Sequence, residues 1–258
     1  MPIRMDKWIF LAASLIALAA CSGGGAAEKA VESEPPSAQQ IVDAAIAKHG
    51  GARYQQFKAE FDFRGRHYTA ARNGAQFTYE RIFTDTTGRR IRDVLTNDGL
   101  YREVDGQRAQ LSEKDSAAYA NSVNSVLYFA LLPAFLNDPA VVKEYAGEAT
   151  IKGQPYHKVS VTFRQEGGGK DFDDEYMYWI HRDSATMDYL AYNYQVDGGG
   201  ARFREAYNVR TVGGLRFADY RNYKPKTDNR KVAEFDLLFE NEGLELLSNI
   251  ETENIAMD

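Results

Sequence analysis

The sequence predicts one antiparallel α+β domain of about ten strands, and three features indicate it. Stretches in which every second residue is apolar recur along most of the chain, as in strands with one buried and one hydrated face. Turn pairs such as Asn73-Gly74 and Asp105-Gly106 separate these stretches, which favours an antiparallel meander. Two segments, residues 37–51 and 111–142, have helical periodicity instead. We therefore expect a single domain over residues 37–258.

Residues 1–20 have the composition of an export signal. Arg4 and Lys7 precede a short apolar run, and small residues precede Cys21. The run is shorter than the roughly 20 residues that a membrane-spanning helix needs. Leu18-Ala-Ala-Cys21 resembles a bacterial lipobox, which implies that Cys21 is acylated, for example with palmitate, and becomes the first residue of the mature chain. The alternative is an ordinary export signal with a chance cysteine.

The composition excludes several classes of binding partner and several kinds of catalytic chemistry. The formal net charge is −6, whereas nucleic-acid-binding proteins usually carry a basic patch, so we expect no nucleic-acid partner. Membrane affinity would then come from the lipid on Cys21. Cys21 is the only cysteine, which excludes an intramolecular disulfide, thiol catalysis elsewhere in the chain and iron–sulfur chemistry. We expect no cofactor and no metal. Residues 21–36 are rich in Gly, Ala, Glu and Pro, as in a flexible tether.

The compact domain is predicted to begin with a helix. Ser37 and Gln40 have the spacing of a capping box, and residues 41–46 provide one apolar face. His49-Gly-Gly51 ends the helix, and the helix dipole favours a histidine in the last turn. The strands are then expected at residues 57–63, 76–83, 89–95, 100–104, 156–163, 175–181, 188–195, 202–209, 215–223, 232–239 and 244–250.

Residues 111–142 interrupt the strands. Ser112 and Asp115 have the spacing of a helix cap, and the helix is predicted to run through Tyr128. Prolines divide the rest of the segment, and polar residues make it too short for a membrane span. We predict a buried or lid-like helical insert.

One pair of residues could support catalysis. The four histidines are not at metal-binding spacings, and there is neither a Gly-x-Ser-x-Gly elbow nor a phosphate-binding loop. His181 and Asp183 lie across a hairpin and could act in an envelope hydrolase, or simply order the hairpin loop. We predict no catalytic residue, with the hydrolase kept as an alternative. A structural, protein-binding envelope lipoprotein with a filled core is the other.

Aromatic residues gather in consecutive strands of the second half of the chain. The 175–181 stretch is apolar on both faces, as in a strand that is covered on both sides. Such aromatics could line a cavity for an amphipathic ligand or fill a plain core. The candidate ligand-binding residues are Tyr178, Trp179, Tyr189, Tyr192, Tyr194, Phe203 and Tyr207. Arg202 and Arg204 flank Phe203 and could meet an anionic headgroup or be solvated.

The order of these elements resembles that of the Lol lipoprotein carrier and receptor superfamily. The shared features are the opening helix ending at His49-Gly-Gly51, the 57–63 strand, the apolar helical insert and the long antiparallel sheet. The resemblance implies a strongly curved half-barrel closed by helices, with an acyl-chain cavity between them. Segments such as Tyr178-Trp-Ile-His181 and Met187-Asp-Tyr-Leu-Ala-Tyr192 are also similar to an exported Gram-negative family that is a domain of unknown function.

These expectations describe a monomeric, periplasm-facing lipoprotein of the outer membrane. Ser22 follows Cys21, and by resemblance to the enterobacterial sorting rule this residue directs the protein to the outer membrane. The domain would bind a lipid, an acyl chain or a lipidated protein as a carrier, receptor or sensor. The 111–142 insert would serve as a lid, and no covalent chemistry is expected.

Overall fold

The computed structural model describes residues 35–166, 174–195 and 198–258. The predicted export signal, Cys21 and most of the predicted tether lie outside the described residues. Residues 36–258 form one compact unit. Three clusters of buried hydrophobic side chains all belong to this unit, so it carries its own core and can fold without residues 1–35.

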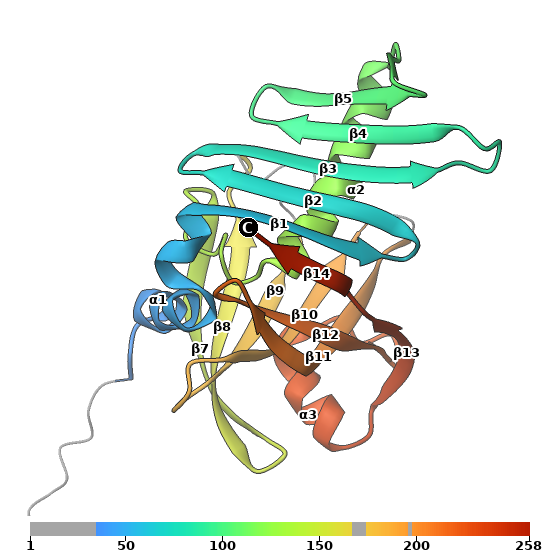
Figure 1. Ribbon diagram of the computed structural model, residues 1–258. Coiled ribbons are helices and arrows are strands. Elements are labelled where there is room, and N and C mark those ends of the chain that lie inside the picture. Colours follow the sequence, from blue (N-terminus) through green and yellow to red (C-terminus); the bar gives the residue numbers. More distant parts are fainter. Residues whose placement is uncertain (1–34, 167–173, 196–197) are drawn as a thin grey trace, which may run out of the picture. The chain divides into compact units, whose positions relative to one another are not determined.

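The described strands form two antiparallel sheets of seven strands each (Figure 1). The first sheet has the order β14-β1-β2-β3-β4-β5-β6. Its strands are β1 (Gln56–Phe63), β2 (Arg66–Asn73), β3 (Gln76–Thr84), β4 (Arg90–Thr96), β5 (Gly99–Val104), β6 (Gln107–Arg108) and β14 (Glu253–Met257). This sheet is the meander predicted from the turn pairs, extended at one edge by the C-terminal strand.

The second sheet has the order β13-β12-β11-β10-β9-β8-β7. Its strands are β7 (Val141–Ile151), β8 (Gln154–Phe163), β9 (Tyr176–His181), β10 (Met187–Tyr194), β11 (Gly200–Val212), β12 (Leu215–Pro225) and β13 (Leu244–Ile250). The antiparallel α+β class is confirmed. The strands, however, are divided between two sheets, whereas the sequence predicts one sheet of about ten strands.

Three α-helices are present among the described residues: α1 (Ala38–His49), α2 (Glu113–Ala130) and α3 (Phe235–Glu240). Both predicted caps are confirmed: Ser37 forms the capping box with Gln40, and Ser112 accepts a hydrogen bond from the Asp115 N–H. Short 3-10 helices occupy Gly51–Gln55 (η1) and Val232–Glu234 (η3). In the described part of the chain, no helix has the length and apolar character needed to cross a membrane.

The predicted strand at residues 232–239 is wrong, because these residues form η3 and α3. Val232 and Phe235 are both buried, and their spacing of three residues places them on one face of a helical turn. The sequence of this stretch also alternates in polarity over a few residues, as a strand does. Short apolar runs of this length fit either period.

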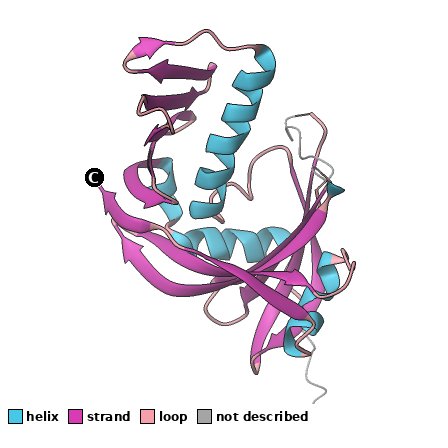
Figure 2. Ribbon diagram, turned by 90° about the vertical axis from the view of Figure 1, so that its right-hand side faces the viewer, coloured by secondary structure: helices cyan, strands magenta, loops and turns pink. Residues whose placement is uncertain are grey.

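The second sheet is covered on both faces. Residues of α1 pack with Tyr178 and Leu190 in one buried cluster. On the opposite face, Val232 and Phe235 pack with Trp179 in another. Strand β9 is therefore buried on both sides, as the sequence predicts. A third cluster joins the first sheet to α2, which runs along that sheet in Figure 2.

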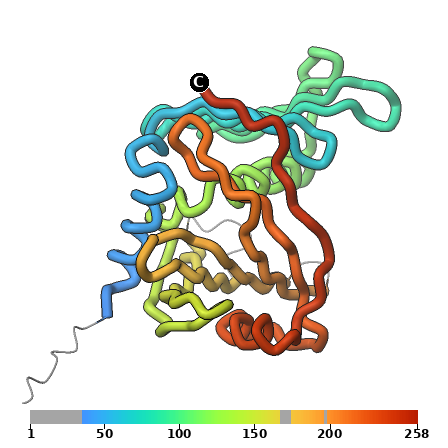
Figure 3. Tube along the Cα trace, turned by 60° about the horizontal axis from the view of Figure 1, so that its bottom comes forward, coloured from blue at the N-terminus to red at the C-terminus, as the bar shows by residue number. Residues whose placement is uncertain are grey.

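The C-terminal strands connect the two sheets. Strand β13 pairs with β12 in the second sheet, and β14 then pairs with β1 in the first. Figure 3 shows this red segment passing from the orange strands to the blue strands. The two sheets are therefore joined at two places, through the segment containing α2 and through the C-terminal segment.

Candidate ligand-binding cleft

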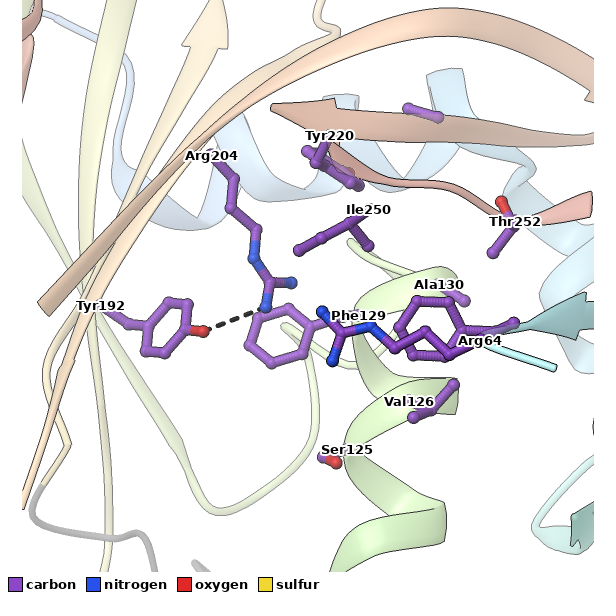
Figure 4. A pocket seen from close by; sticks show the side chains of 12 residues that line it. Arg64, Ser125, Val126, Phe129, Ala130, Tyr192, Arg204, Tyr220, Ile250 and Thr252 are labelled. Atoms are coloured by element: carbon purple, nitrogen blue, oxygen red, sulfur yellow. Dashed lines mark hydrogen bonds between the residues drawn. The ribbon is translucent and has the colours of Figure 1, made fainter. Parts of the chain in front are cut away.

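A cleft of about 340 Å³ lies among α2, strands β10 to β13 of the second sheet and the end of β1 (Figure 4). We call it the Arg204 cleft. Its lining residues are Phe63, Arg64, Ser125, Val126, Phe129, Ala130, Tyr192, Arg204, Ala218, Tyr220, Ile250 and Thr252. Most of them are apolar or aromatic. The volume lies near the lower end of the range of small-ligand pockets, roughly 300–1,000 Å³.

Helical periodicity explains why α2 forms one wall of this cleft. Val126, Phe129 and Ala130 are three and four residues apart, so they lie on one face of the helix. Val123 and Leu127 lie on a neighbouring face and are fully buried against the first sheet. The same helix therefore anchors itself with one face and lines the cleft with another.

Charged residues of the first sheet hold α2 in place. The fully buried Asp93 on β4 accepts hydrogen bonds from Arg81 on β3 at 2.9 and 2.7 Å, and from Arg102 on β5 at 2.6 and 3.1 Å. The Arg81 Nη1 donates to the Ser122 hydroxyl of α2 at 2.6 Å. The Arg102 guanidinium carbon lies 3.5 Å from the ring centroid of Tyr119, also on α2. This network sets the position of the cleft wall.

Arg204 on β11 brings a positive charge into the apolar cleft. Only 9% of the residue is exposed. Its Nη2 donates to the Tyr192 hydroxyl at 3.0 Å, and its guanidinium carbon lies 4.0 Å from the ring centroid of Phe129, a cation–π distance. Within the described residues, Nε and Nη1 make no hydrogen bond, and no carboxylate lies within 4 Å of this guanidinium. Among the described residues, the contacts of the Arg204 guanidinium are therefore aromatic rings and one phenol hydroxyl.

Arg64 lies at the rim of the same cleft, in the turn between β1 and β2. The residue is exposed, and its guanidinium carbon lies 5.1 Å from the ring centroid of Phe63. Figure 4 shows the side chains of Arg64 and Arg204 entering from different sides, both directed toward the ring of Phe129. Burial raises the pKa of Tyr220, so this phenol stays neutral at neutral pH. Among the described lining residues there is no Asp or Glu, which makes the cleft cationic.

Another face of α2 lines a second cleft of about 340 Å³, which contains Asn124 and Tyr128. Burial raises the pKa of the Asp138 carboxyl in this cleft, while the nearby Arg72 opposes the shift. Burial also raises the pKa of Tyr128 to about 12. This second cleft carries a carboxyl group as well as an arginine, so its charge is mixed and differs from that of the Arg204 cleft.

The aromatic residues predicted to line one cavity lie in different places. Tyr192 lines the Arg204 cleft. Tyr178 is fully buried in the cluster beneath α1, where its hydroxyl lies 3.5 Å from that of Tyr128. The opposite face of the sheet, in the cluster beneath α3, buries Trp179, Tyr189 and Phe203. Adjacent residues of a strand point to opposite faces, so a run of aromatics in sequence supplies two cores and only part of a cleft wall.

Tyr194 and Tyr207 are half-buried and do not line the Arg204 cleft. The Tyr194 ring centroid lies 5.2 Å from the guanidinium carbon of Arg202. The Tyr207 hydroxyl donates to the Glu251 carboxylate at 2.6 Å. Of the seven predicted ligand-binding residues, Tyr192 is therefore the one that lines the Arg204 cleft. It stays a predicted ligand-binding residue.

The predicted ligand-binding residues omit most of the cleft lining, including Phe129 and Arg64. A signal for Phe129 was present, because Val126, Phe129 and Ala130 recur with helical spacing inside the predicted insert. Arg64 carried no such signal. A turn residue reaches this cleft only because the first sheet ends beside the second, and that arrangement is a long-range property of the fold.

The geometry at His181 is that of a hairpin turn. The backbone N–H groups of Asp183 and Ser184 donate to the His181 Nδ1 at 3.2 and 3.3 Å. The Asp183 side chain is 74% exposed and lies near Arg182, 3.7 Å from its Nε. These contacts agree with the loop-ordering interpretation of His181. In the part of the chain that the structure describes, no three His, Cys, Asp or Glu side chains are grouped so as to hold a metal ion.

A model of a protein family of unknown function, DUF6503, matches residues 27–252. The chain belongs to the DUF6503 family. This membership confirms the expected domain of unknown function, and it assigns no activity. No curated protein matches the chain.

Two solved structures resemble the DUF6503 chain in fold. One is a LolA superfamily protein from Nitrosomonas europaea, with a TM-score of 0.49 and 10% identity, covering 86% of this chain and 94% of that one. The other is a DUF1329 family protein from Desulfovibrio piger, with a TM-score of 0.48 and 13% identity, covering 86% of this chain and 93% of that one.

Proposed function

We propose that this DUF6503 chain is a periplasm-facing lipoprotein of the outer membrane that binds a lipid, an acyl chain or a lipidated protein in the Arg204 cleft. The observation that carries the proposal is the cleft itself, an apolar and aromatic recess of ligand size with few polar groups. The export-type sequence ending at Cys21 supports secretion and a lipid anchor. The proposed mechanism is binding and hand-over, without a covalent step.

The walls of the cleft suit an acyl chain. Val126, Phe129 and Ile250 supply apolar surface from α2 and from the second sheet. Transfer of each CH2 group from water to such surface contributes about 0.8 kcal/mol. Each CH2 group that enters the cleft therefore strengthens the binding of the chain.

The proposal is tested by filling the cleft. Ala130→Phe places a ring in the cleft from α2, and Ala118→Phe makes the same change at an exposed position of the same helix. Residues 36–258 are exported to a bacterial periplasm, purified without detergent and extracted with organic solvent for mass spectrometry. We expect about one equivalent of lipid or fatty acid from the wild type and from Ala118→Phe, and a loss from Ala130→Phe.

A second measurement covers the case in which the native ligand is lost during purification. Dodecanol and dodecanoate, below their micelle concentrations, are titrated into the protein by calorimetry. A clean extract together with no binding of either probe would overturn the proposed function. Equal ligand content in all three proteins would place the ligand outside the Arg204 cleft.

A further inference from the structure

We infer that the Arg204 cleft selects a single-chain amphiphile with an anionic headgroup, a carboxylate or a phosphate, bound between Arg204 and Arg64. The inference rests on the proposed function and adds the chemical class of the ligand.

The first step is the unpaired charge of Arg204. A guanidinium has five N–H donors, and among the described residues Arg204 donates only to the Tyr192 hydroxyl. A buried charge is costly unless a counter-charge or hydrogen bonds compensate it. Among the described residues the other buried arginine is compensated: Arg81, which is 3% exposed, has both Asp93 and Ser122. Arg204 is buried nearly as deeply, and the described residues offer it no carboxylate.

The second step is the direction in which the free donors of Arg204 point. Nη2 is held by Tyr192, and the guanidinium plane lies over the ring of Phe129, both of which are lining residues. These two contacts orient the charged group inside the cleft, as Figure 4 shows. Nη1 keeps its donors available, so a ligand oxygen that reaches this group forms a charge-assisted hydrogen bond.

The third step is the second arginine. The Arg64 side chain makes no ion pair or hydrogen bond within the described part of the chain, and it is directed toward the same ring from the exposed rim. Two cations without an acidic neighbour repel each other, and an anion between them relieves the repulsion. An exposed rim cation next to a buried one leads an anionic headgroup from solvent into the cleft.

The fourth step is the number of chains. A volume of about 340 Å³ lies near the bottom of the ligand-pocket range, roughly 300–1,000 Å³. Such a volume favours one acyl chain over a lipid with two or more. The remaining walls, including Val126, Ile250 and Ala218, provide apolar surface for that chain.

The test compares four probes that share a twelve-carbon chain: dodecanoate, dodecyl phosphate, dodecanol and dodecyltrimethylammonium. Each is titrated below its micelle concentration into residues 36–258. Charge-assisted hydrogen bonds from arginine predict that one or both anionic probes bind the wild type about tenfold or more tightly than dodecanol. The cationic probe is expected to bind more weakly than dodecanol. A preference for dodecanoate indicates a fatty acid, and a preference for dodecyl phosphate indicates a phosphorylated lipid.

Single variants then show which arginine causes the preference for anionic probes. Arg204→Met removes the buried charge and keeps an unbranched side chain over Phe129. The matched control is Arg202→Met on the same strand; Arg202 does not line the cleft and donates to the Ala201 carbonyl. Arg64→Asn removes the rim charge at a φ of +50°, a backbone conformation that asparagine adopts readily. We expect the anion preference to fall to about equality in Arg204→Met, to fall partly in Arg64→Asn and to stay unchanged in Arg202→Met.

The outcomes separate this inference from the proposed function. If dodecanol binds as tightly as both anions to the wild type, the inference fails and lipid binding stands. If no probe binds, the proposed function fails. An anion preference that survives both Arg204→Met and Arg64→Asn overturns the site. Should Arg204→Met not fold, the wild-type preference and its partial fall in the exposed Arg64→Asn variant decide the matter.

Discussion

His49 shows how burial determines the charge of a histidine. The sequence predicts this residue in the last turn of the first helix, and the structure confirms that position. In the structure His49 is 3% exposed, and its Nε2 accepts the Met187 N–H at 3.0 Å. Burial, reinforced by the positive charge of Arg216, lowers the pKa of His49 to about 3. The neutral imidazole therefore joins α1 to β10, so burial and not the helix dipole determines the charge of His49.

This His49 contact predicts a loss of stability on acidification. The pKa of His49 is about 3 in the folded chain and 6.5 when unfolded, so the unfolded chain binds more protons between these values. The contribution of neutral His49 is complete above pH 6.5 and is lost as the pH falls toward 3. Between pH 6.5 and pH 4, we expect the free energy of unfolding to fall by roughly 3 kcal/mol through this residue.

Urea unfolding of residues 36–258 at several pH values measures this effect. Glutamine at position 49 keeps an acceptor for the Met187 N–H and does not titrate. The His49→Gln variant should be less stable at pH 7.5, with a shallower decline toward pH 4 than the wild type. Parallel declines in the two proteins would show that His49 does not account for the acid sensitivity.

Arg202 and Arg204, which flank Phe203, show what the alternation of residues along a strand can predict and what it cannot. Alternation along the strand correctly puts Arg204 on the face opposite Phe203, which is buried beneath α3. It cannot separate Arg204 from Arg202, since both share that face. Arg204 differs from Arg202 because Phe129 of α2 packs against its guanidinium group. That contact spans 75 positions in the sequence, so no local pattern reports it.

At the element scale, the buried charges of the first sheet are predicted to hold α2 and hence the cleft wall. Asparagine at position 93 leaves Arg81 and Arg102 without their shared carboxylate. Removing one partner of a buried ion pair costs about 3–5 kcal/mol, because it leaves uncompensated buried charge. We expect Asp93→Asn to lower the free energy of unfolding by about that amount in urea. Glu245→Gln, which breaks the exposed pair with Lys224, should change it far less.

A milder variant tests whether the network holds α2 specifically or stabilises the whole unit. Ser122→Ala removes the hydroxyl that accepts from Arg81 Nη1, a hydrogen bond to a charged group. Amide hydrogen exchange should then rise along α2 and stay unchanged in α1. Uniform changes in both helices would mean that the network supports the whole unit and does not specifically hold this helix.

At the scale of the whole molecule, local patterns predict elements better than their assembly. Capping residues and turn pairs give α1, α2 and strands such as β3 to β5, because these signals act within a few residues. The chain leaves the first sheet after β6 and begins the second at β7, and it returns at its end, where β13 pairs with β12 and β14 crosses to β1. Strand β14 pairs with β1, which lies about 190 positions earlier in the sequence. The short sequence of β14, Glu253–Met257, shows little alternation of polar and apolar residues. The cleft forms where these long-range pairings meet α2, which is why only part of its lining could be predicted.

The proposed lipid anchor belongs to a different part of the chain from the cleft. The lipobox-like sequence predicts that cells expressing the full chain attach labelled palmitate to it, and that Cys21→Ser abolishes the label. Two or more acyl chains then supply stable membrane attachment. Residues 36–258 contain the whole described core and the Arg204 cleft, so they should bind dodecanoate without Cys21. An unlabelled full chain would refute the anchor alone. Loss of dodecanoate binding on removal of residues 1–35 would instead show that the leader segment takes part in the site.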